Sequence, residues 1–342
     1  HGSEHSFPTR RSSDLQPSPG VYNDTILEGL DYLMLQLQRR GMVAVLYLNN
    51  SWEWSGGYGF YLENAGAGKA LQPNEVGYSA YVKYAAQFAT NPKAQQLFFN
   101  HLNFILKRTN RYTGKPYTED PAIMSWQICN EPRAFDKAAL PQFEAWIAKA
   151  AAMMKSIDKR HLVSVGSEGA FGCEADYDSW QRICSDANID YCNVHIWPYN
   201  WGWAKKDSLM QNMQRAQEYT KDYLDRHLEI CAQINKPLVM EEFGYPRDGV
   251  SFSKQSATTA RDAYYNYVFS LLADDLAKGG YFVGCNFWGW GGHAQPQHEQ
   301  WIPGDDYVCD PPQEPQGLYS VFSSDDSTIK IIKAGIANLP KR

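Results

Sequence analysis

The segment DPAIMSWQICNEPR, residues 120–133, leads from an apolar run into a polar tip that contains Glu131. A second segment, KPLVMEEFGYPRD at residues 236–248, has the same design and carries the pair Glu241 and Glu242 after its apolar run. Short continuous apolar runs bounded by turn residues are typical of strands buried in a parallel sheet. Both segments therefore predict an α/β fold with carboxylates at the carboxyl ends of its strands.

The same pattern repeats along the chain. Four other apolar runs have strand length, and they lie at residues 42–48, 162–165, 191–195 and 281–287. We expect the run at 42–48 to be buried on both faces of its sheet. Helical stretches with one apolar face separate the strands, at residues 22–41, 77–108, 137–157, 207–234, 257–277 and 328–337.

Strands that alternate with helices, without a linker, indicate one parallel α/β domain over residues 20–342. A doubly wound sheet would carry a glycine-rich phosphate turn after an early strand, and the sequence has none. Chemistry at strand ends favours a (β/α)8 TIM barrel. Only six strands are counted, so we expect about the first two to be absent, leaving the first and last strands facing a gap. Residues 1–19 are predicted to be non-native or disordered, because FPTRRSSDL resembles a translated adapter sequence.

Composition excludes several classes of partner. The chain has 342 residues and a net charge of −6, which argues against binding to nucleic acid or to an anionic membrane. Its apolar runs are shorter than the roughly 18–20 residues that a membrane-spanning helix needs. We therefore expect neither nucleic acid nor a membrane as a partner.

The cysteines and acidic clusters predict no metal or cofactor. The seven cysteines lack C-x-x-C pairs. A disulfide between Cys173 and Cys184 is possible but not required by the sequence. Because the number of cysteines is odd, they do not indicate the cellular compartment of the protein. Asp305, Asp306 and Asp310 do not have the spacing of an EF-hand loop, so we expect them in a solvated loop.

Glu131 and the Glu241–Glu242 pair together indicate a glycosidase mechanism. Retaining glycosidases place two carboxyl groups about 5–5.5 Å apart, one protonated and one ionised. Strand tips around a barrel mouth can supply such a pair. The alternative is that Glu131 caps a helix and that the pair lies on the surface.

Tryptophans give a second argument for a carbohydrate substrate. Sugar rings stack their C–H faces on indole, whose N–H can bind a hydroxyl group. Trp126, Trp146 and Trp180 lie within strands or helices, so they are expected in the core. The other eight lie at or just beyond strand ends, and they are Trp52, Trp54, Trp197, Trp201, Trp203, Trp288, Trp290 and Trp301.

Longer blocks carry a family resemblance. LYLNNSWEWSGG, DPAIMSWQICNEPRAF, VHIWPYNWGW, EEFGYPRD, CNFWGWGG and GDDYVCDPPQEPQGLYSVF together resemble glycoside hydrolase family 5, and within it the endo-β-1,4-mannanases. The resemblance runs from about Tyr22 to the C-terminus. It implies a secreted, cell-surface or periplasmic monomer that hydrolyses β-1,4-mannosidic bonds in mannan, glucomannan or galactomannan.

The resemblance also implies the roles of the central residues. Glu131 matches the acid/base. The nucleophile precedes an aromatic residue and a glycine, which selects Glu242. Asn130 matches the residue that binds the sugar 2-hydroxyl, His195 orients the nucleophile, and Trp288 forms the floor under the sugar.

Further residues are expected to contact the sugar or to support the carboxylates. Trp197 stands where the family often has tyrosine, and Tyr199 is a nearby substitute for it. Trp52 and Trp203 are predicted to bind sugar. The residues predicted to support the site are Arg133, Arg247 and Glu168, the last of these structural rather than catalytic.

Two rival functions remain open at this stage. A β-1,4-glucanase would use the same carboxylates, and rates on mannan and carboxymethylcellulose distinguish it. A non-catalytic glycan-binding fragment would bind polysaccharide without releasing reducing sugar.

Overall fold

The computed structural model describes residues 15–53, 57–312 and 314–340. Its contacts divide the chain into two units, residues 1–192 and 193–342. Most of the predicted non-native stretch, residues 1–14, lies outside the described residues, and the boundary at residue 19 stays a prediction. Gln16 belongs to this stretch, and it is buried and donates a hydrogen bond to the Tyr22 hydroxyl at 3.2 Å.

The first unit contains a parallel sheet of three strands. They are β1 (Ala44–Tyr47), β2 (Ile123–Gln127) and β3 (Leu162–Ser164), in the order β1-β2-β3. Each lies within a predicted apolar run. The carboxyl end of β2 therefore leads directly into the NEPR segment, as predicted.

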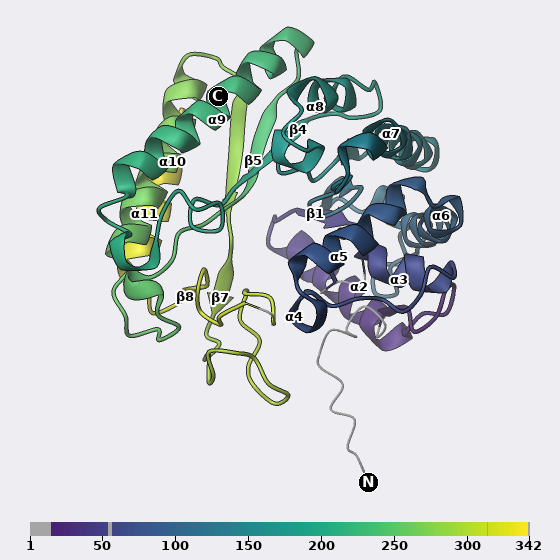
Figure 1. The fold of residues 1–342 in the computed structure, drawn as a ribbon, viewed down its shortest axis with the longest axis horizontal. Coiled ribbons are helices and arrows are strands. Elements are labelled where there is room, and N and C mark those ends of the chain that lie inside the picture. Colours follow the sequence, from purple (N-terminus) through teal and green to yellow (C-terminus); the bar gives the residue numbers. More distant parts are fainter. Residues whose placement is uncertain (1–14, 54–56, 313, 341–342) are drawn as a thin grey trace. The chain divides into compact units, whose positions relative to one another are not determined.

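Helices surround this sheet (Figure 1). In chain order they are α2 (Asp24–Arg39), α3 (Gly57–Asn64), α4 (Pro73–Val76), α5 (Tyr78–Ala85), α6 (Pro92–Leu106), α7 (Leu140–Ile157) and α8 (Tyr177–Cys184). The helical stretch predicted over 77–108 is two α-helices rather than one. Asn91 caps α6 by accepting a hydrogen bond from the Ala94 N–H, and Pro92 begins the helix at a position that needs no N–H donor.

Strand β1 corrects one expectation. Met42, Val43 and Tyr47 are 53%, 54% and 48% exposed, so the run at 42–48 is not buried on both faces. Strand β1 is an edge of the sheet, with β2 as its neighbour. Apolar side chains beside an edge strand lack the second neighbour that covers a central strand.

The second unit contains the remaining predicted strands. They are β4 (Cys192–Ile196), β5 (Leu238–Phe243) and β6 (Phe282–Phe287), in the order β4-β5-β6. Two shorter strands, β7 (Trp290–Gly292) and β8 (Val321–Phe322), pair with each other and were not predicted.

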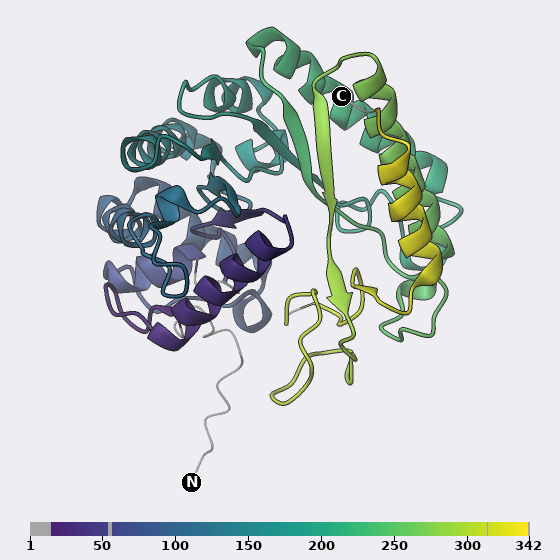
Figure 2. The same ribbon diagram turned by 180° about the vertical axis from the view of Figure 1, so that it is seen from behind.

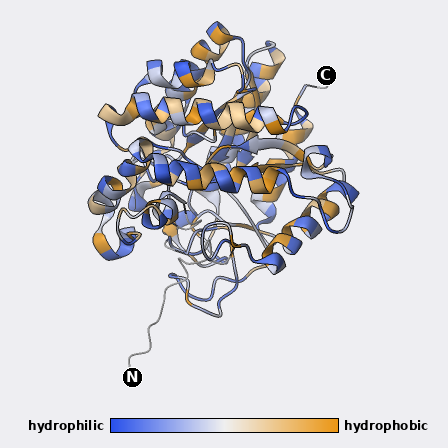
Figure 3. Ribbon diagram, turned by 90° about the vertical axis from the view of Figure 1, so that its right-hand side faces the viewer, coloured by the Kyte–Doolittle hydropathy of each residue, from blue (hydrophilic) through white to orange (hydrophobic). Residues whose placement is uncertain are grey.

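Three long helices complete the second unit. They are α9 (Met213–Ile234), α10 (Thr259–Ala277) and α11 (Asp326–Ala337). Helix α10 packs against β6, α9 and α11, and the three helices lie on one side of the sheet (Figure 2). Apolar and polar residues share the circumference of the helices, as expected where one face packs and the other meets water (Figure 3).

The core contains the three tryptophans predicted there and several of the cysteines. Trp126, Trp146 and Trp180 are each at most 1% exposed. Cys173 and Cys184 are buried free thiols rather than a disulfide. Within the described residues, no helix is long and apolar enough to cross a membrane.

Asp310 corrects the prediction of a solvated loop. It is 4% exposed, and its carboxylate accepts hydrogen bonds from the backbone N–H groups of Gly317 and Tyr319 at 2.9 Å and from the Ser320 hydroxyl at 2.6 Å. Burial raises the pKa of Asp310. Arg261, which is also buried, donates to the carbonyl oxygens of Leu318 and Ser320, both at 2.9 Å. Side chains therefore form hydrogen bonds with both the N–H and the C=O groups of the segment that leads into β8.

Acid is expected to weaken the fold through His227 on α9. His227 is fully buried, and its Nδ1 donates to the Tyr223 carbonyl at 2.6 Å. Burial lowers its pKa to about 4 from the ordinary 6.5. The unfolded chain therefore binds this proton first, and stability is lost as the pH falls from 6.5 towards 4. The free energy of unfolding, measured with urea, should be lower at pH 4.5 than at pH 7. This decrease should be smaller in His227→Gln than in the parent protein, by about 2–3 kcal/mol. Identical losses in the two proteins would contradict this expectation.

Candidate active site

Glu131 lies in a constrained turn just beyond β2. Its backbone N–H donates to the Gly166 carbonyl at 2.9 Å, and its φ of 45° is in the left-handed region that side chains rarely adopt. A Cβ on Gly166 would lie 2.0 Å from the Cys129 carbonyl oxygen, so only glycine allows this approach. Unfavourable backbone angles of this kind cost about 1–3 kcal/mol and concentrate at functional sites.

The side chain of Glu131 is held by Trp52. The indole Nε1 of Trp52 donates to Oε2 of Glu131 at 2.6 Å, and the Ser51 hydroxyl donates to the Glu131 carbonyl. Glu131 and Trp52 are each 8% exposed. The carboxyl group is therefore fixed by a neutral donor in a largely buried setting.

Other side chains fix the Trp52 ring in turn. Its centroid lies 6.0 Å from that of Tyr81, with an angle of 19° between the ring planes. The centroid of Phe135 is 5.6 Å away, and the angle between those ring planes is 72°. The Arg133 guanidinium lies 5.4 Å from the ring centroid and forms hydrogen bonds of 2.5 and 2.6 Å with Glu168. Burial opposes the charge on Arg133, but Glu168 outweighs it and raises the pKa of Arg133. Arg133 and Glu168 thus form an ion pair beside Trp52, and their predicted supporting role stays a prediction.

Asn130 and Glu53 complete this part of the site. The Asn130 N–H donates to the Asn49 carbonyl at 2.8 Å, and its side-chain amide donates to Asn50 at 3.4 Å. Glu53 is 4% exposed, and burial raises its pKa to about 7. Glu53 follows Trp52 directly in the chain, and no motif marked it as a site residue.

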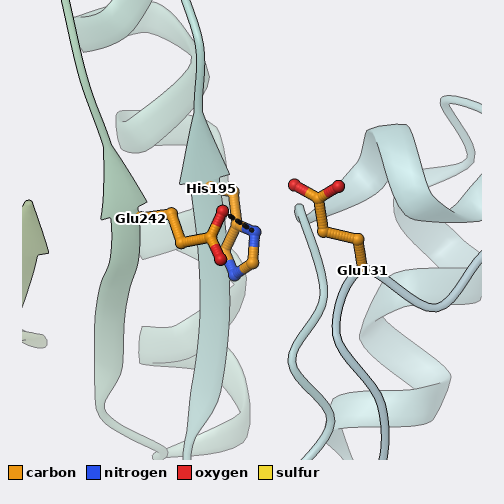
Figure 4. Close-up of side chains that lie close together, drawn as sticks. All are labelled: Glu131, His195 and Glu242. Carbon is orange, nitrogen blue, oxygen red and sulfur yellow. Dashed lines mark ion pairs between the residues drawn. The ribbon is translucent and has the colours of Figure 1, made fainter. Parts of the chain in front are cut away.

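Glu242 and His195 face each other from neighbouring strands of the second unit. Nδ1 of His195, on β4, lies 3.2 Å from Oε2 of Glu242, on β5 (Figure 4). The His195 side chain is 1% exposed and that of Glu242 is 13% exposed. The pairing of β5 with β6 is irregular between Met240 and Phe243, so strand alternation does not by itself choose between Glu241 and Glu242. The contact supports the choice of Glu242, and Figure 4 also shows the side chain of Glu131.

The glycine of the EFG motif has a packing role. A Cβ on Gly244 would lie 2.7 Å from the Trp197 ring and 2.8 Å from the Tyr319 ring. Trp197 and Tyr319 are buried and pack with Tyr199 and Trp288 in one aromatic cluster. The motif therefore lets aromatic rings close over the backbone immediately after Glu242.

The other tryptophans near the strand ends differ in how far they are buried. Trp203 packs in an aromatic group with Trp201, 5.0 Å away between centroids, and with Tyr219, 5.6 Å away. Trp290 is 56% exposed, whereas Trp301 is buried. Trp54 lies outside the described residues.

The hydrogen bonds of Arg247 join two segments of the second unit. This fully buried guanidinium donates to the Asp325 carboxylate and to the Ser256 carbonyl, the latter at 3.1 Å. Asp325 is 78 residues away in sequence, so no local signal marked the pair. Arg247 therefore ties the loop after β5 to the start of α11.

Comparison with known proteins places these features in a family. A family model described as "GH family 5 beta-mannosidase-like" matches residues 1–342. Mannan endo-1,4-beta-mannosidase 1 of Arabidopsis thaliana is 30% identical over 292 residues, which cover 80% of this chain and 64% of that protein. The chain therefore spans slightly less than two thirds of this relative.

Solved structures agree with that assignment. The glycoside hydrolase family 5 mannosidase from Rhizomucor miehei is 36% identical to this chain, with a TM-score of 0.84. The match covers 95% of this chain and 78% of the mannosidase chain. The endo-1,4-beta-mannanase from the same organism has a TM-score of 0.65 and 25% identity, covering 93% and 79%. This likeness confirms the predicted fold class, a glycosidase of the (β/α)8 type. The chain belongs to the β-mannosidase-like proteins of glycoside hydrolase family 5.

Proposed function

We propose that this chain hydrolyses β-1,4-mannosidic bonds of mannan-type polysaccharides with retention of configuration. Glu242 attacks the anomeric carbon while Glu131 protonates the departing oxygen, giving a covalent glycosyl–enzyme. Glu131 then deprotonates a water molecule that attacks the same carbon and releases Glu242. The sugar leaves with the β-configuration that it had in the substrate.

The contact between His195 and Glu242 carries this proposal. A histidine N–H that donates to a carboxylate stabilises its ionised form and fixes its orientation, as a nucleophile requires. Glu131 instead accepts a hydrogen bond from the neutral indole of Trp52. Two carboxyl groups with such different partners suit the roles of nucleophile and acid/base.

The position of cleavage is proposed to be internal, as in the name of the Arabidopsis relative. A second candidate is exo-acting release of terminal mannose. It is favoured by the higher identity to the Rhizomucor miehei mannosidase, 36%, than to the endo-mannanase of that organism, 25%. Location outside the cell and a monomeric state stay predictions.

Digestion of mannohexaose tests the stereochemistry and the position of cleavage together. We expect internal fragments from the first minutes, with the β-anomer as the first product in proton NMR. Mannose and mannopentaose as the only early products would favour the mannosidase. The α-anomer as first product would rule out Glu242 as nucleophile. Faster hydrolysis of carboxymethylcellulose than of mannan would favour the glucanase, and binding of mannan without reducing sugar would favour a glycan-binding role.

A further inference from the structure

Trp52 was expected to stack on sugar, but its surroundings point to a different task. Its side chain is almost wholly buried, and its ring contacts Tyr81, Phe135 and Arg133. A ring covered in this way offers little face to a sugar. Its one polar group, the Nε1–H, is directed at the carboxyl of Glu131.

We propose that Trp52 is a positioning residue for the acid/base, and that its indole N–H directs the catalytic proton of Glu131 to Oε1. This inference rests on the proposed function, because it assigns the proton that Glu131 delivers. It replaces sugar stacking as the role of Trp52.

The hydrogen-bonding chemistry of indole leads to this assignment. An indole N–H can donate but cannot accept, so the Glu131 oxygen that it contacts must serve as acceptor in both protonation states. The carbonyl oxygen of a neutral carboxyl group is a stronger acceptor than its hydroxyl oxygen, so the acid is more stable with Oε2 as the carbonyl oxygen. The proton of the neutral acid therefore belongs on Oε1. The indole thus favours one of the two oxygens as the site of the proton.

The supports of Trp52 maintain this arrangement. Tyr81 donates its hydroxyl to the Ser51 carbonyl, so the ring partner of Trp52 is itself fixed to the adjoining backbone. Arg133 is held against the indole by its two hydrogen bonds to Glu168. Among the described residues of this unit, the titratable or charged groups around Glu131 and Trp52 include Glu53, Tyr78, Tyr81, Cys129, Arg133 and Glu168.

Trp52→Phe tests the proposal, because it keeps an aromatic ring and removes the N–H. We expect kcat on mannan to fall about tenfold or more, since proton donation is worth about 10²–10⁴-fold and only its alignment is lost. Aryl mannosides with good leaving groups should lose much less, and KM should change little. The alkaline limb of the pH–rate profile should move to higher pH, because the N–H stabilises the ionised carboxylate. The same shift in a Glu53→Gln background would exclude Glu53 as its source.

Trp146→Phe is the matched control. Trp146 is 1% exposed in the same unit, and its Nε1 has no hydrogen-bond partner among the described residues. This variant should leave both the pH profile and the ratio of rates on the two substrates unchanged. Equal losses on mannan and aryl mannoside in Trp52→Phe, with an unmoved alkaline limb, would overturn the proposal.

A measurement independent of turnover separates this inference from the proposed function. In the full chain labelled with ¹⁵N-tryptophan, the Trp52 indole resonance is identified by its loss in Trp52→Phe. In a Glu53→Gln background, which removes the neighbouring titration, it should move with pH and become insensitive to pH once Glu131→Gln is added. A Trp52 resonance with the same pH dependence in both proteins would reject the contact, whether or not the chain cleaves mannan.

Discussion

Glu242→Ala is expected to lower kcat on mannan by about 10⁴-fold or more, because no group remains to form the covalent intermediate. Initial rates of reducing-sugar release measure this loss. Azide should restore part of the activity towards aryl mannosides by occupying the space of the missing carboxylate and attacking the anomeric carbon. The product of that rescued reaction should be the α-mannosyl azide, because only one displacement then takes place.

The neighbouring carboxylate provides the control for this experiment. Glu241→Ala makes the same chemical change one residue earlier on β5. It should retain most of the parent activity and show no response to azide. A loss as large in Glu241→Ala as in Glu242→Ala would show that the nucleophile had been wrongly chosen.

Glu131→Ala is expected to slow hydrolysis of mannan by about 10²–10⁴-fold, the usual contribution of general acid catalysis. Aryl mannosides with acidic leaving groups should form the glycosyl–enzyme at nearly the parent rate, since these groups leave without protonation. Comparison of kcat/KM for the two substrate types measures the difference.

Glu131→Gln distinguishes the acid role from packing. Glutamine preserves the shape of the side chain and an oxygen acceptor for Trp52, but it cannot deliver a proton. It should therefore be nearly as slow as Glu131→Ala on mannan. Equal losses on mannan and on activated aryl mannosides in both variants would argue against Glu131 as the acid.

Local patterns predicted the positions of the strands well, but they could not predict which strands would have buried side chains on both faces. The six apolar runs all contain strands because a buried parallel strand needs an unbroken apolar stretch. Exposure of Met42, Val43 and Tyr47 depends on what lies beside β1, which a local pattern does not contain. The break at Asn91 and Pro92 did have a local signal, because a cap residue followed by proline marks the start of a helix.

The candidate site shows the same limit. The sequence named Glu131 and Glu242 because strand ends and family motifs identify them. The hydrogen bond between Trp52 and Glu131 joins residues 79 positions apart, so it left no local signal. The same is true of the bond between Arg247 and Asp325, which are 78 positions apart.

The hydrogen bonds that Asp310 and Arg261 form with the segment before β8 have a consequence for protein engineering. Backbone groups of residues 317–320 are anchored by side chains from outside the stretch 293–309. The stretch 293–309 adds contacts of its own, because the Glu299 carbonyl accepts from the Gln316 N–H at 2.7 Å and the Cys309 N–H donates to the Ser320 hydroxyl at 3.2 Å. Sequences exchanged into this loop should therefore leave β8 in register where they keep these two contacts.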